Sequence, residues 1–197
     1  MSDSEEVRAE VAALRSEVER LAAELTDMRA HASLLESLAQ EDPLTHLLNR
    51  RGFFRELSRA IAFRKRYGTS IALLLADLDR FKLLNDSQGH EAGDQALVHL
   101  ATVLRQNVRA SDSLGRLGGD EFGMILWQVD ESGMQTKSRM LETIVATSTL
   151  PLGGADFRLG ASIGGTLLLP EDTPEEALSR ADQAMYVRKL ERRPNGR

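Results

Sequence analysis

The sequence contains no cysteine, few aromatic residues and no long apolar run. Without cysteine the chain forms no disulfide, no thiolate metal site and no thiol nucleophile, and a reducing compartment is compatible with it. The longest apolar run, 71–76, is far shorter than the roughly 20 residues that cross a bilayer. The first residues are polar and acidic, unlike a signal peptide. We therefore expect a cytoplasmic protein.

A strong excess of charge of one sign is also missing. The 30 acidic and 25 basic residues leave a formal net charge of −5, which gives no general attraction for nucleic acid or an anionic membrane. Of the 197 residues 42% are hydrophobic, enough for one domain with a core and an additional segment. We expect neither a nucleic-acid partner nor a membrane partner.

Residues 6–40 contain neither glycine nor proline and are predicted to form one helix that dimerises as a coiled coil. Its apolar residues recur in alternating steps of four and three, which is a heptad repeat. β-Branched residues at the a positions with leucine at d favour a parallel two-stranded coil, and Glu10 and Glu24 can meet Arg15 and Arg29 of the other helix. The repeat consists of Val7, Val11, Leu14, Val18, Leu21, Leu25, Met28, Ala32 and Leu35.

Two other interpretations of this segment stay open. It could be a single amphipathic helix that packs on the following domain, although such a helix usually has a wider apolar stripe. The repeat weakens at Ala32 and Ala39, where Leu34 and Leu38 form a second stripe. This second stripe permits either a change of register or the end of the coil.

From residue 41 to residue 197 the pattern becomes mixed and predicts an α+β domain with a mixed or antiparallel sheet. The short apolar run 71–77 is typical of a strand buried on both faces. Gly118 and Gly119 join two short strands as a hairpin, and Thr173 with Pro174 begins the last helix. We expect helices at 53–67, 91–108, 133–148 and 174–193, strands at 71–77, 112–117, 121–127 and 157–169, and a loop around Pro151 and 153–154.

Acidic residues lie where these strands are expected to end. Asp77 closes one apolar run and Asp79 follows it, while Asp120 and Glu121 come directly after the two glycines. Carboxylates of this kind bind Mg²⁺ together with substrate phosphates, and glycine lets a nucleotide approach the backbone. Taken alone, such acids are more often solvated turn residues.

Five segments, in order, resemble the GGDEF diguanylate cyclase family over about 42–193. The name-giving motif is Gly118-Gly119-Asp120-Glu121-Phe122. The resemblance implies a central mixed, mainly antiparallel sheet flanked by helices. The chain departs from the family at His46, where glycine is commoner, and at Arg188 and Arg192, where alanine and glycine are usual. The other similar segments are 42–50, 77–94, 161–164 and 181–189.

The resemblance implies a role for each matching residue. Asp77, Asp120 and the carbonyl of Leu78 would bind Mg²⁺, or Mn²⁺ in its place, with Glu121 beside them near the reacting sugar and phosphate. Catalysis would depend on Asp120, Glu121 and Lys82. Asn85 and Asp94 would read the guanine edge, and Asp94 favours GTP over ATP. The nucleotide would approach the protein backbone at Gly118 and Gly119, and its phosphates would be bound by Lys82, Lys189, Arg193 and the amides near Arg80 and Phe81.

The interpretation of single residues is weaker without this pattern. Asn85 or Lys82 in isolation would be a surface residue, Gly89 and Gly93 are expected in turns, and Phe81 is expected to pack. Arg109 and Asp112 form an Arg-x-x-Asp sequence that resembles the family's inhibitory product-binding site, in which Arg stacks on guanine and Asp accepts from its edge. As a bare tetrapeptide it would be a helix-end salt bridge.

The implied reaction joins two GTP molecules into cyclic di-GMP and releases two pyrophosphates. Each domain supplies half of the site, so a homodimer formed through the coil would bring the second half. Product feedback through Arg109 and Asp112 is expected. Two alternatives are a catalytically silent module that binds GTP or cyclic di-GMP, and a scaffold protein that functions through its coiled coil.

Overall fold

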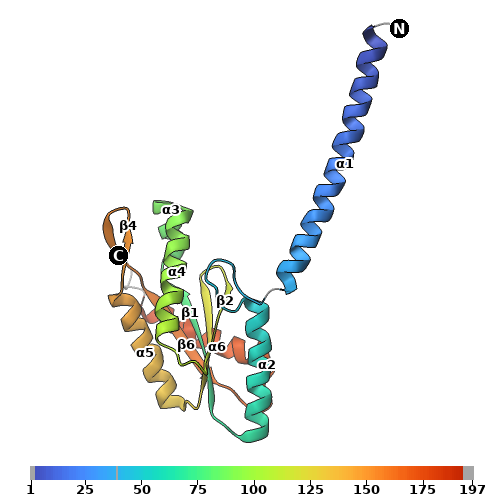
Figure 1. Cartoon of the computed structure of the whole chain (residues 1–197). Coiled ribbons are helices and arrows are strands. Elements are labelled where there is room, and N and C mark those ends of the chain that lie inside the picture. Colours follow the sequence, from blue (N-terminus) through green and yellow to red (C-terminus); the bar gives the residue numbers. More distant parts are fainter. Residues whose placement is uncertain (1–2, 39, 193–197) are drawn as a thin grey trace. The chain divides into compact units, whose positions relative to one another are not determined.

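The computed structural model describes residues 3–38 and 40–192, without the side chains of 3–7, 9, 30–38 and 155. By its contacts the chain divides into two units, Met1–Ala39 and Gln40–Arg197. Figure 1 shows the elements of both units. In the described ranges, no helix combines the length and apolar character that spanning a membrane requires.

The first unit is one uninterrupted helix, α1 (Asp3–Leu38). The described apolar side chains of the heptad repeat, such as Leu14 and Val18, are exposed in the single chain at 59% and 64%. Arg20 pairs within the helix with Glu17 at 2.5 Å and Glu24 at 2.6 Å. The predicted repeat residues Val7, Ala32 and Leu35 lie outside the described side chains.

The second unit is built on a four-stranded antiparallel sheet in the order β2-β3-β1-β6. Its strands are β1 (Ile71–Leu78), β2 (Ser113–Gly118), β3 (Glu121–Trp127) and β6 (Ala161–Leu167). Strand β1 is central and buried along its whole length, as its apolar run predicts. The register sets Asp77 opposite Glu121 on one neighbour and opposite Ser162 on the other.

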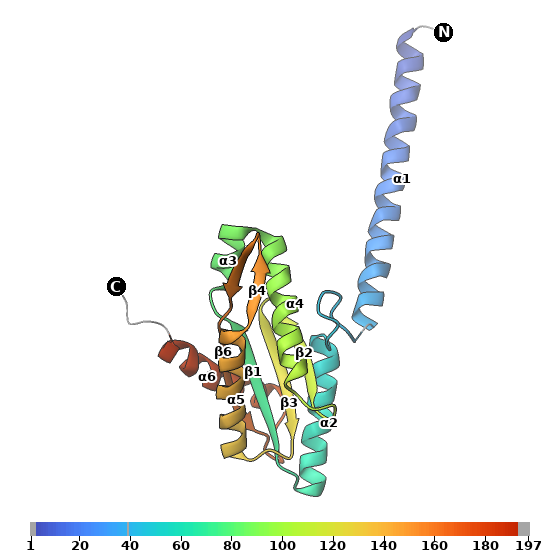
Figure 2. The same ribbon diagram turned by 60° about the vertical axis from the view of Figure 1, so that its left-hand side comes forward.

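Helices cover both faces of this sheet (Figures 1 and 2). Alternate residues of β1 point to opposite faces, so Leu74 packs with α4 (His90–Gln106) and α5 (Glu131–Thr147), whereas Leu73 packs with α2 (Arg50–Tyr67) and α6 (Pro174–Arg192). A short helix, α3 (Phe81–Gln88), follows β1 and contacts α4. The sequence had not indicated α3 as a separate helix.

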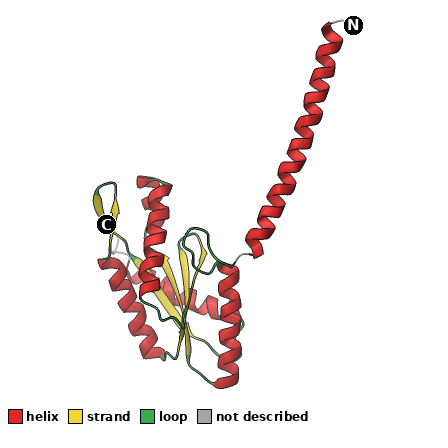
Figure 3. Cartoon of the chain, in the orientation of Figure 1, coloured by secondary structure: helices red, strands yellow, loops and turns green. Residues whose placement is uncertain are grey.

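The predicted loop around Pro151 and the predicted strand 157–169 are wrong in part. Strands β4 (Thr149–Leu152) and β5 (Ala155–Arg158) form a separate two-stranded hairpin, and β6 begins only at Ala161. Figure 3 shows this small hairpin apart from the central sheet. Gly153 and Gly154 form its turn at φ 56° and 85°, the positive values that two-residue hairpin turns require. Proline is tolerated because this short hairpin has only edge strands.

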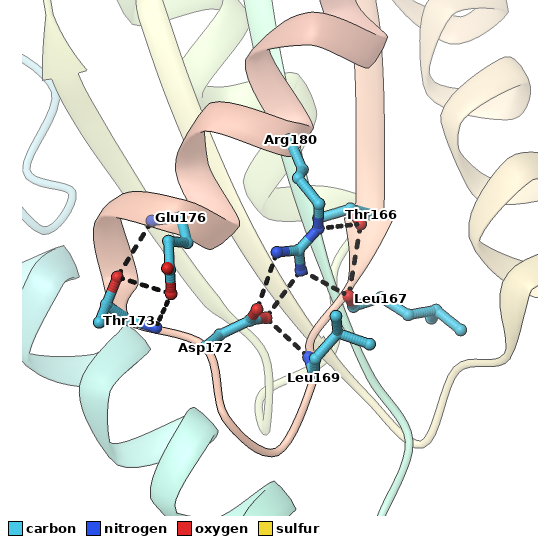
Figure 4. Close-up of polar contacts among 7 residues, drawn as sticks. All are labelled: Thr166, Leu167, Leu169, Asp172, Thr173, Glu176 and Arg180. Atoms are coloured by element: carbon cyan, nitrogen blue, oxygen red, sulfur yellow. Dashed lines mark hydrogen bonds and ion pairs between the residues drawn. The ribbon is translucent and has the colours of Figure 1, made fainter.

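The start of α6 follows the sequence signal. Thr173 and Glu176 form a capping box, since the Thr173 N–H donates to the Glu176 carboxylate at 2.9 Å and the Glu176 N–H donates to the Thr173 hydroxyl at 3.3 Å. Arg180 donates twice to Asp172 at 2.7 Å and also to the Leu167 carbonyl at 3.2 Å (Figure 4). These bonds fix α6 to the end of β6, so the cationic side chains at its other end have a defined place.

Candidate active site

The site begins where β1 ends beside the β2–β3 hairpin. The Leu78 N–H donates to the Asp120 carbonyl at 3.3 Å, which ties the strand end to the turn. Gly119 has φ 51°, a left-handed value that costs a residue with a side chain free energy, so the glycine sets the position of Asp120. The Asp77 side chain is 11% exposed. The two predicted acids thus lie at one end of the sheet, Asp77 in β1 and Asp120 in the turn between β2 and β3.

A cavity of about 350 Å³ opens at this place. The helix α3 begins on it, and its first amides have no partner within the helix, so they are suited to an anion. Arg80 precedes this helix at φ 59° and provides no side-chain cap. The cavity therefore brings together six residues that the resemblance assigned to the site, the strand-end acid Asp79, and Arg192, which the sequence had not indicated as a site residue. Its lining consists of Leu78, Asp79, Arg80, Phe81, Lys82, Asp120, Lys189 and Arg192.

The charges around the cavity are crowded. Lys189 Nζ lies 2.5 Å from Asp77 Oδ1, an ion pair between α6 and β1. Burial raises the pKa of Asp77 above its ordinary value, the negative charges of Asp120 and Asp79 raise it further, and the hydrogen bond from Lys189 opposes both. Burial also raises the pKa of Glu121, again with nearby acids. Such mutually destabilised carboxylates favour a nearby cation.

The arrangement fits a metal ion that relies on few protein ligands. Within residues 3–38 and 40–192, no group of three or more His, Asp or Glu side chains is gathered closely enough to hold a metal. Mg²⁺ usually takes only one or two carboxylates and completes its shell with water and substrate phosphates. Asp77, Asp120 and the carbonyl of Leu78 meet that requirement. They do not form a metal cage by themselves.

The residues expected to read guanine lie apart from this cavity, on α3 and α4. The Asn85 Oδ1 atom is buried and has no hydrogen-bond partner among the described residues. A Cβ on Gly93 would lie 1.9 Å from that atom, so a larger residue there would displace the Asn85 side chain. The expectation that Gly93 is a turn residue is therefore wrong, because it lies inside α4. Gly89, at φ 86°, does form the turn between the helices. Asp94 is exposed beside Gly93.

Glu121 faces a second, neighbouring cavity of about 300 Å³. Arg50 from α2 and Asp182 from α6 also line it. Asp120, in the turn, lines the first cavity and Glu121, at the start of β3, lines the second, while Glu121 stays opposite Asp77 in the register of the sheet. Arg193, expected to bind phosphate, lies outside the described residues.

Hydrogen bonds and an ion pair that the sequence did not indicate hold the turn between β2 and β3. Arg116 donates to the Gly119 carbonyl at 2.9 and 2.8 Å and pairs with Asp42 at 3.2 Å. The Asp42 carboxylate also accepts from the Thr45 N–H at 2.8 Å and from its hydroxyl at 2.7 Å. His46, at φ 53°, occupies the left-handed position of this turn, where a glycine carries no steric cost. The segment 42–46 is therefore joined directly to the turn that carries Asp120.

The Arg-x-x-Asp sequence lies at the other end of the β2–β3 hairpin, where β2 begins and β3 ends. The Asp112 carboxylate accepts from the backbone N–H groups of Arg109 at 2.9 Å and Trp127 at 3.1 Å. In this described part of the chain no ion pair joins the Arg109 and Asp112 side chains, so the helix-end salt bridge is not formed. Both residues line a cavity of about 570 Å³ with Lys137. Burial lowers the pKa of Lys137, with Asp112 opposing and Arg109 adding to the effect. Sequence reasoning had missed this lysine, which comes from the distant helix α5.

A family model described as diguanylate cyclase, GGDEF domain, matches residues 39–195. Diguanylate cyclase TpbB of Pseudomonas aeruginosa PAO1 is 38% identical over 192 residues, which cover 94% of this chain and 42% of TpbB. The chain therefore spans less than half the length of this curated relative.

Two solved structures from Caulobacter crescentus are also similar. The GGDEF domain of DgcB in complex with c-di-GMP has a TM-score of 0.75 at 33% identity, covering 79% of this chain and 92% of that one. The coiled coil and GGDEF domain of DgcB, also with c-di-GMP, has a TM-score of 0.74 at 30% identity, covering 91% and 96%.

Proposed function

The chain belongs to the GGDEF-domain diguanylate cyclase family, and on that premise we propose that it condenses two GTP molecules into cyclic di-GMP and two pyrophosphates. The observation that carries the proposal is the cavity at the end of β1, where Asp120 and the amides of α3 meet Lys82 and Lys189. An anion-binding helix start, cations and metal-binding acids are what phosphoryl chemistry on a nucleotide requires.

The residues that line the cavity, together with Asp77 beside it, have two roles, to bind the metal and to bind the phosphates. Asp77, Asp120 and the Leu78 carbonyl would hold Mg²⁺, or Mn²⁺ in its place. The ion, when bound, lowers the pKa of the attacking 3′-hydroxyl and neutralises charge on the phosphate oxygens. Lys82 and the first amides of α3 bind the phosphates and stabilise the leaving pyrophosphate. Lys189, which pairs with Asp77 in the structure, joins them when it leaves the carboxylate.

Guanine recognition is assigned to Asn85 and Asp94. The support is the buried Asn85 Oδ1 atom, which has no partner in the described chain and which a base donor would satisfy. The Asp94 carboxylate accepts from the N1–H and the exocyclic amine of guanine, whereas adenine lacks both donors at these positions. We therefore expect GTP to be preferred over ATP.

Each domain holds one GTP, so two copies must face each other. The exposed heptad repeat of α1 supports a parallel coiled-coil dimer, which raises the effective concentration of the second half-site to the order of mM. Replacing Leu14 and Leu21 together with Asp is expected to give monomers with greatly reduced turnover at low protein concentration. Light scattering and product formation check this, and full turnover by demonstrated monomers would rule out the role of the coil.

Product inhibition is assigned to the cavity of Arg109, Asp112 and Lys137. Among the described residues the Arg109 guanidinium forms no ion pair, so it can stack on a guanine, while the backbone N–H groups that donate to Asp112 fix the loop. Titrating cyclic di-GMP into the assay should inhibit the wild type and leave Arg109→Ala active over a wider range of product concentration. Equal inhibition of both proteins would remove this assignment.

The direct test is incubation with GTP and Mg²⁺, and separately with Mn²⁺, followed by chromatography. A cyclase produces cyclic di-GMP, and Asp120→Asn abolishes the product while keeping the circular dichroism spectrum. A silent binding module would retain GTP without converting it, and a coiled-coil scaffold would do neither. A folded wild-type dimer that makes no product from GTP would refute the proposed activity.

A further inference from the structure

A buried carboxylate on α5 contacts one of the arginines that line the cavity of about 350 Å³ at the end of β1, called the phosphate cavity below. The Glu142 side chain is only 6% exposed, and a buried charge needs partners to offset its lost hydration. It accepts from Arg188 Nη2 at 2.7 Å and from the Ile163 N–H at 3.0 Å, and it lies 3.4 Å from Arg192 Nη1. Three segments, α5, β6 and the end of α6, thus converge on one acid.

Arg192 is held between this acid and the cavity. Its Nε atom lies 3.7 Å from Asp79 Oδ2, and Asp79 is itself fixed by the Ser162 hydroxyl at 2.7 Å. The Arg192 side chain is 30% exposed and lines the cavity together with Lys82 and Lys189. Arg192 therefore borders the space that the phosphates would fill.

The distances from Arg192 to Glu142 and to Asp79 show that these acids orient its guanidinium but do not use all of its hydrogen-bond donors. Both are longer than the roughly 2.7–2.9 Å of a charge-assisted hydrogen bond. A guanidinium has five N–H donors in a planar fork that matches phosphate oxygens. Lys189, by contrast, is engaged with Asp77 at 2.5 Å. Arg192 is thus a cation of the cavity with donors available to a ligand.

We infer that Arg192 binds the terminal phosphates of the nucleotide and that Glu142 is the residue that positions it. The inference rests on the proposed function and adds a residue to it. Arg192 stands where the family commonly has glycine, so this contact is a property of the present chain. Both arginines approach the same Glu142 oxygen, Oε2, Arg188 at 2.7 Å and Arg192 at 3.4 Å, so Arg192 makes the longer contact and also lines the cavity.

The test compares two nucleotides on the full chain with Mg²⁺ by calorimetry. 3′-Deoxy-GTP has all three phosphates but no attacking hydroxyl, and GMP lacks the terminal phosphates. Arg192→Ala should weaken 3′-deoxy-GTP about tenfold, the loss of one charge-assisted contact, and leave GMP unchanged. With GTP as substrate, KM should rise more than kcat falls. Arg192→Lys should recover part of the affinity, and Arg139→Ala, which removes an exposed arginine of α5, should change neither nucleotide.

The role of Glu142 is tested through Arg192. Glu142→Gln keeps an acceptor for the Ile163 N–H but removes the charge, so it should weaken 3′-deoxy-GTP severalfold. In an Arg192→Ala background the same change should add no further loss. Equal weakening of GMP and 3′-deoxy-GTP by Arg192→Ala, or no weakening of either, would overturn the inference.

The proposed function fails separately. If the wild type makes no cyclic di-GMP and binds 3′-deoxy-GTP no better than GMP, the nucleotide assignment itself is wrong. If the wild type does both and Arg192→Ala behaves like it, only the role of Arg192 is wrong.

Discussion

Removing the Asp42 carboxylate is expected to loosen the turn that carries Asp120. The Asp42 and Arg116 side chains are each only 16% exposed, and Asp42 also accepts two hydrogen bonds from Thr45. Losing one partner of a fully buried ion pair costs about 3–5 kcal/mol, and an exposed pair contributes about 0–1 kcal/mol. Because this pair is mostly buried and Arg116 keeps the Gly119 carbonyl, Asp42→Ala should cost about 2–3 kcal/mol.

Urea unfolding followed by circular dichroism measures this loss. The matched control is Glu171→Ala, because Glu171 and Lys65 also join distant segments, at 2.7 Å, but are 79% and 59% exposed. The control should lose less than about 0.5 kcal/mol. Cyclic di-GMP formation, measured where Asp42→Ala is still folded, should fall as well, since Arg116 then holds Gly119 less rigidly. Equal losses in the two variants, or full activity of Asp42→Ala, would refute the reasoning.

The Asp42 carboxylate should also make the stability of the wild type depend on pH. Burial alone would raise the pKa of Asp42, but the hydrogen bonds from Thr45 and the charge of Arg116 outweigh it and hold the pKa below the ordinary value. In acid the unfolded chain therefore binds the proton more readily than the folded one. The stabilisation is complete above the ordinary pKa of an aspartate and is lost as pH falls through the folded value. Asp42→Asn should lack this acid-side loss.

Three further substitutions test packing, capping and burial. Gly164→Ala would place a Cβ 2.0 Å from the backbone nitrogen of Met185, so α6 must shift. Urea unfolding should show that the free energy of unfolding falls by about 3 kcal/mol or more. A variant as stable as the wild type would contradict the close contact. Thr173→Ala removes one half of the capping box with Glu176 and should cost about 1 kcal/mol, with no loss if the cap is unimportant. Burial lowers the pKa of His99, so stability should fall as pH drops from about 6.5 toward the folded value, a slope that His99→Gln should abolish.

Periodicity and turn chemistry sufficed for most of the fold. The α1 helix lacks any breaker, β1 is an apolar run of strand length, and the pair Gly118 and Gly119 marks its hairpin. The β4–β5 hairpin was missed because Pro151 and two glycines also read as a loop. The deciding feature is that Leu150 and Leu152 are both buried, which only the packing of the hairpin against the core reveals.

The site was predictable only where its chemistry is local. Acids at strand ends can be recognised from neighbouring residues, whereas the partner of a side chain depends on the tertiary fold. Lys189 lies 112 residues from Asp77, and Arg116 lies 74 residues from Asp42. No sequence pattern relates residues at such separations. The resemblance indicated that Lys189 binds phosphate, and only the structure shows that it also neutralises Asp77.

The arginines at the end of α6 show that positive charges which seem unnecessary in the sequence can have partners in the structure. By comparison with the family, Arg188 and Arg192 are additional positive charges on a surface helix. In the structure each meets an acid from another element, since Arg188 pairs with Glu142 of α5 and Arg192 lies between Glu142 and Asp79. A buried Glu142 without these arginines would be an uncompensated charge, and without Glu142 the Arg192 side chain would keep only its 3.7 Å contact with Asp79. The three residues are therefore best understood as one unit, which orients positive charge toward the phosphate cavity.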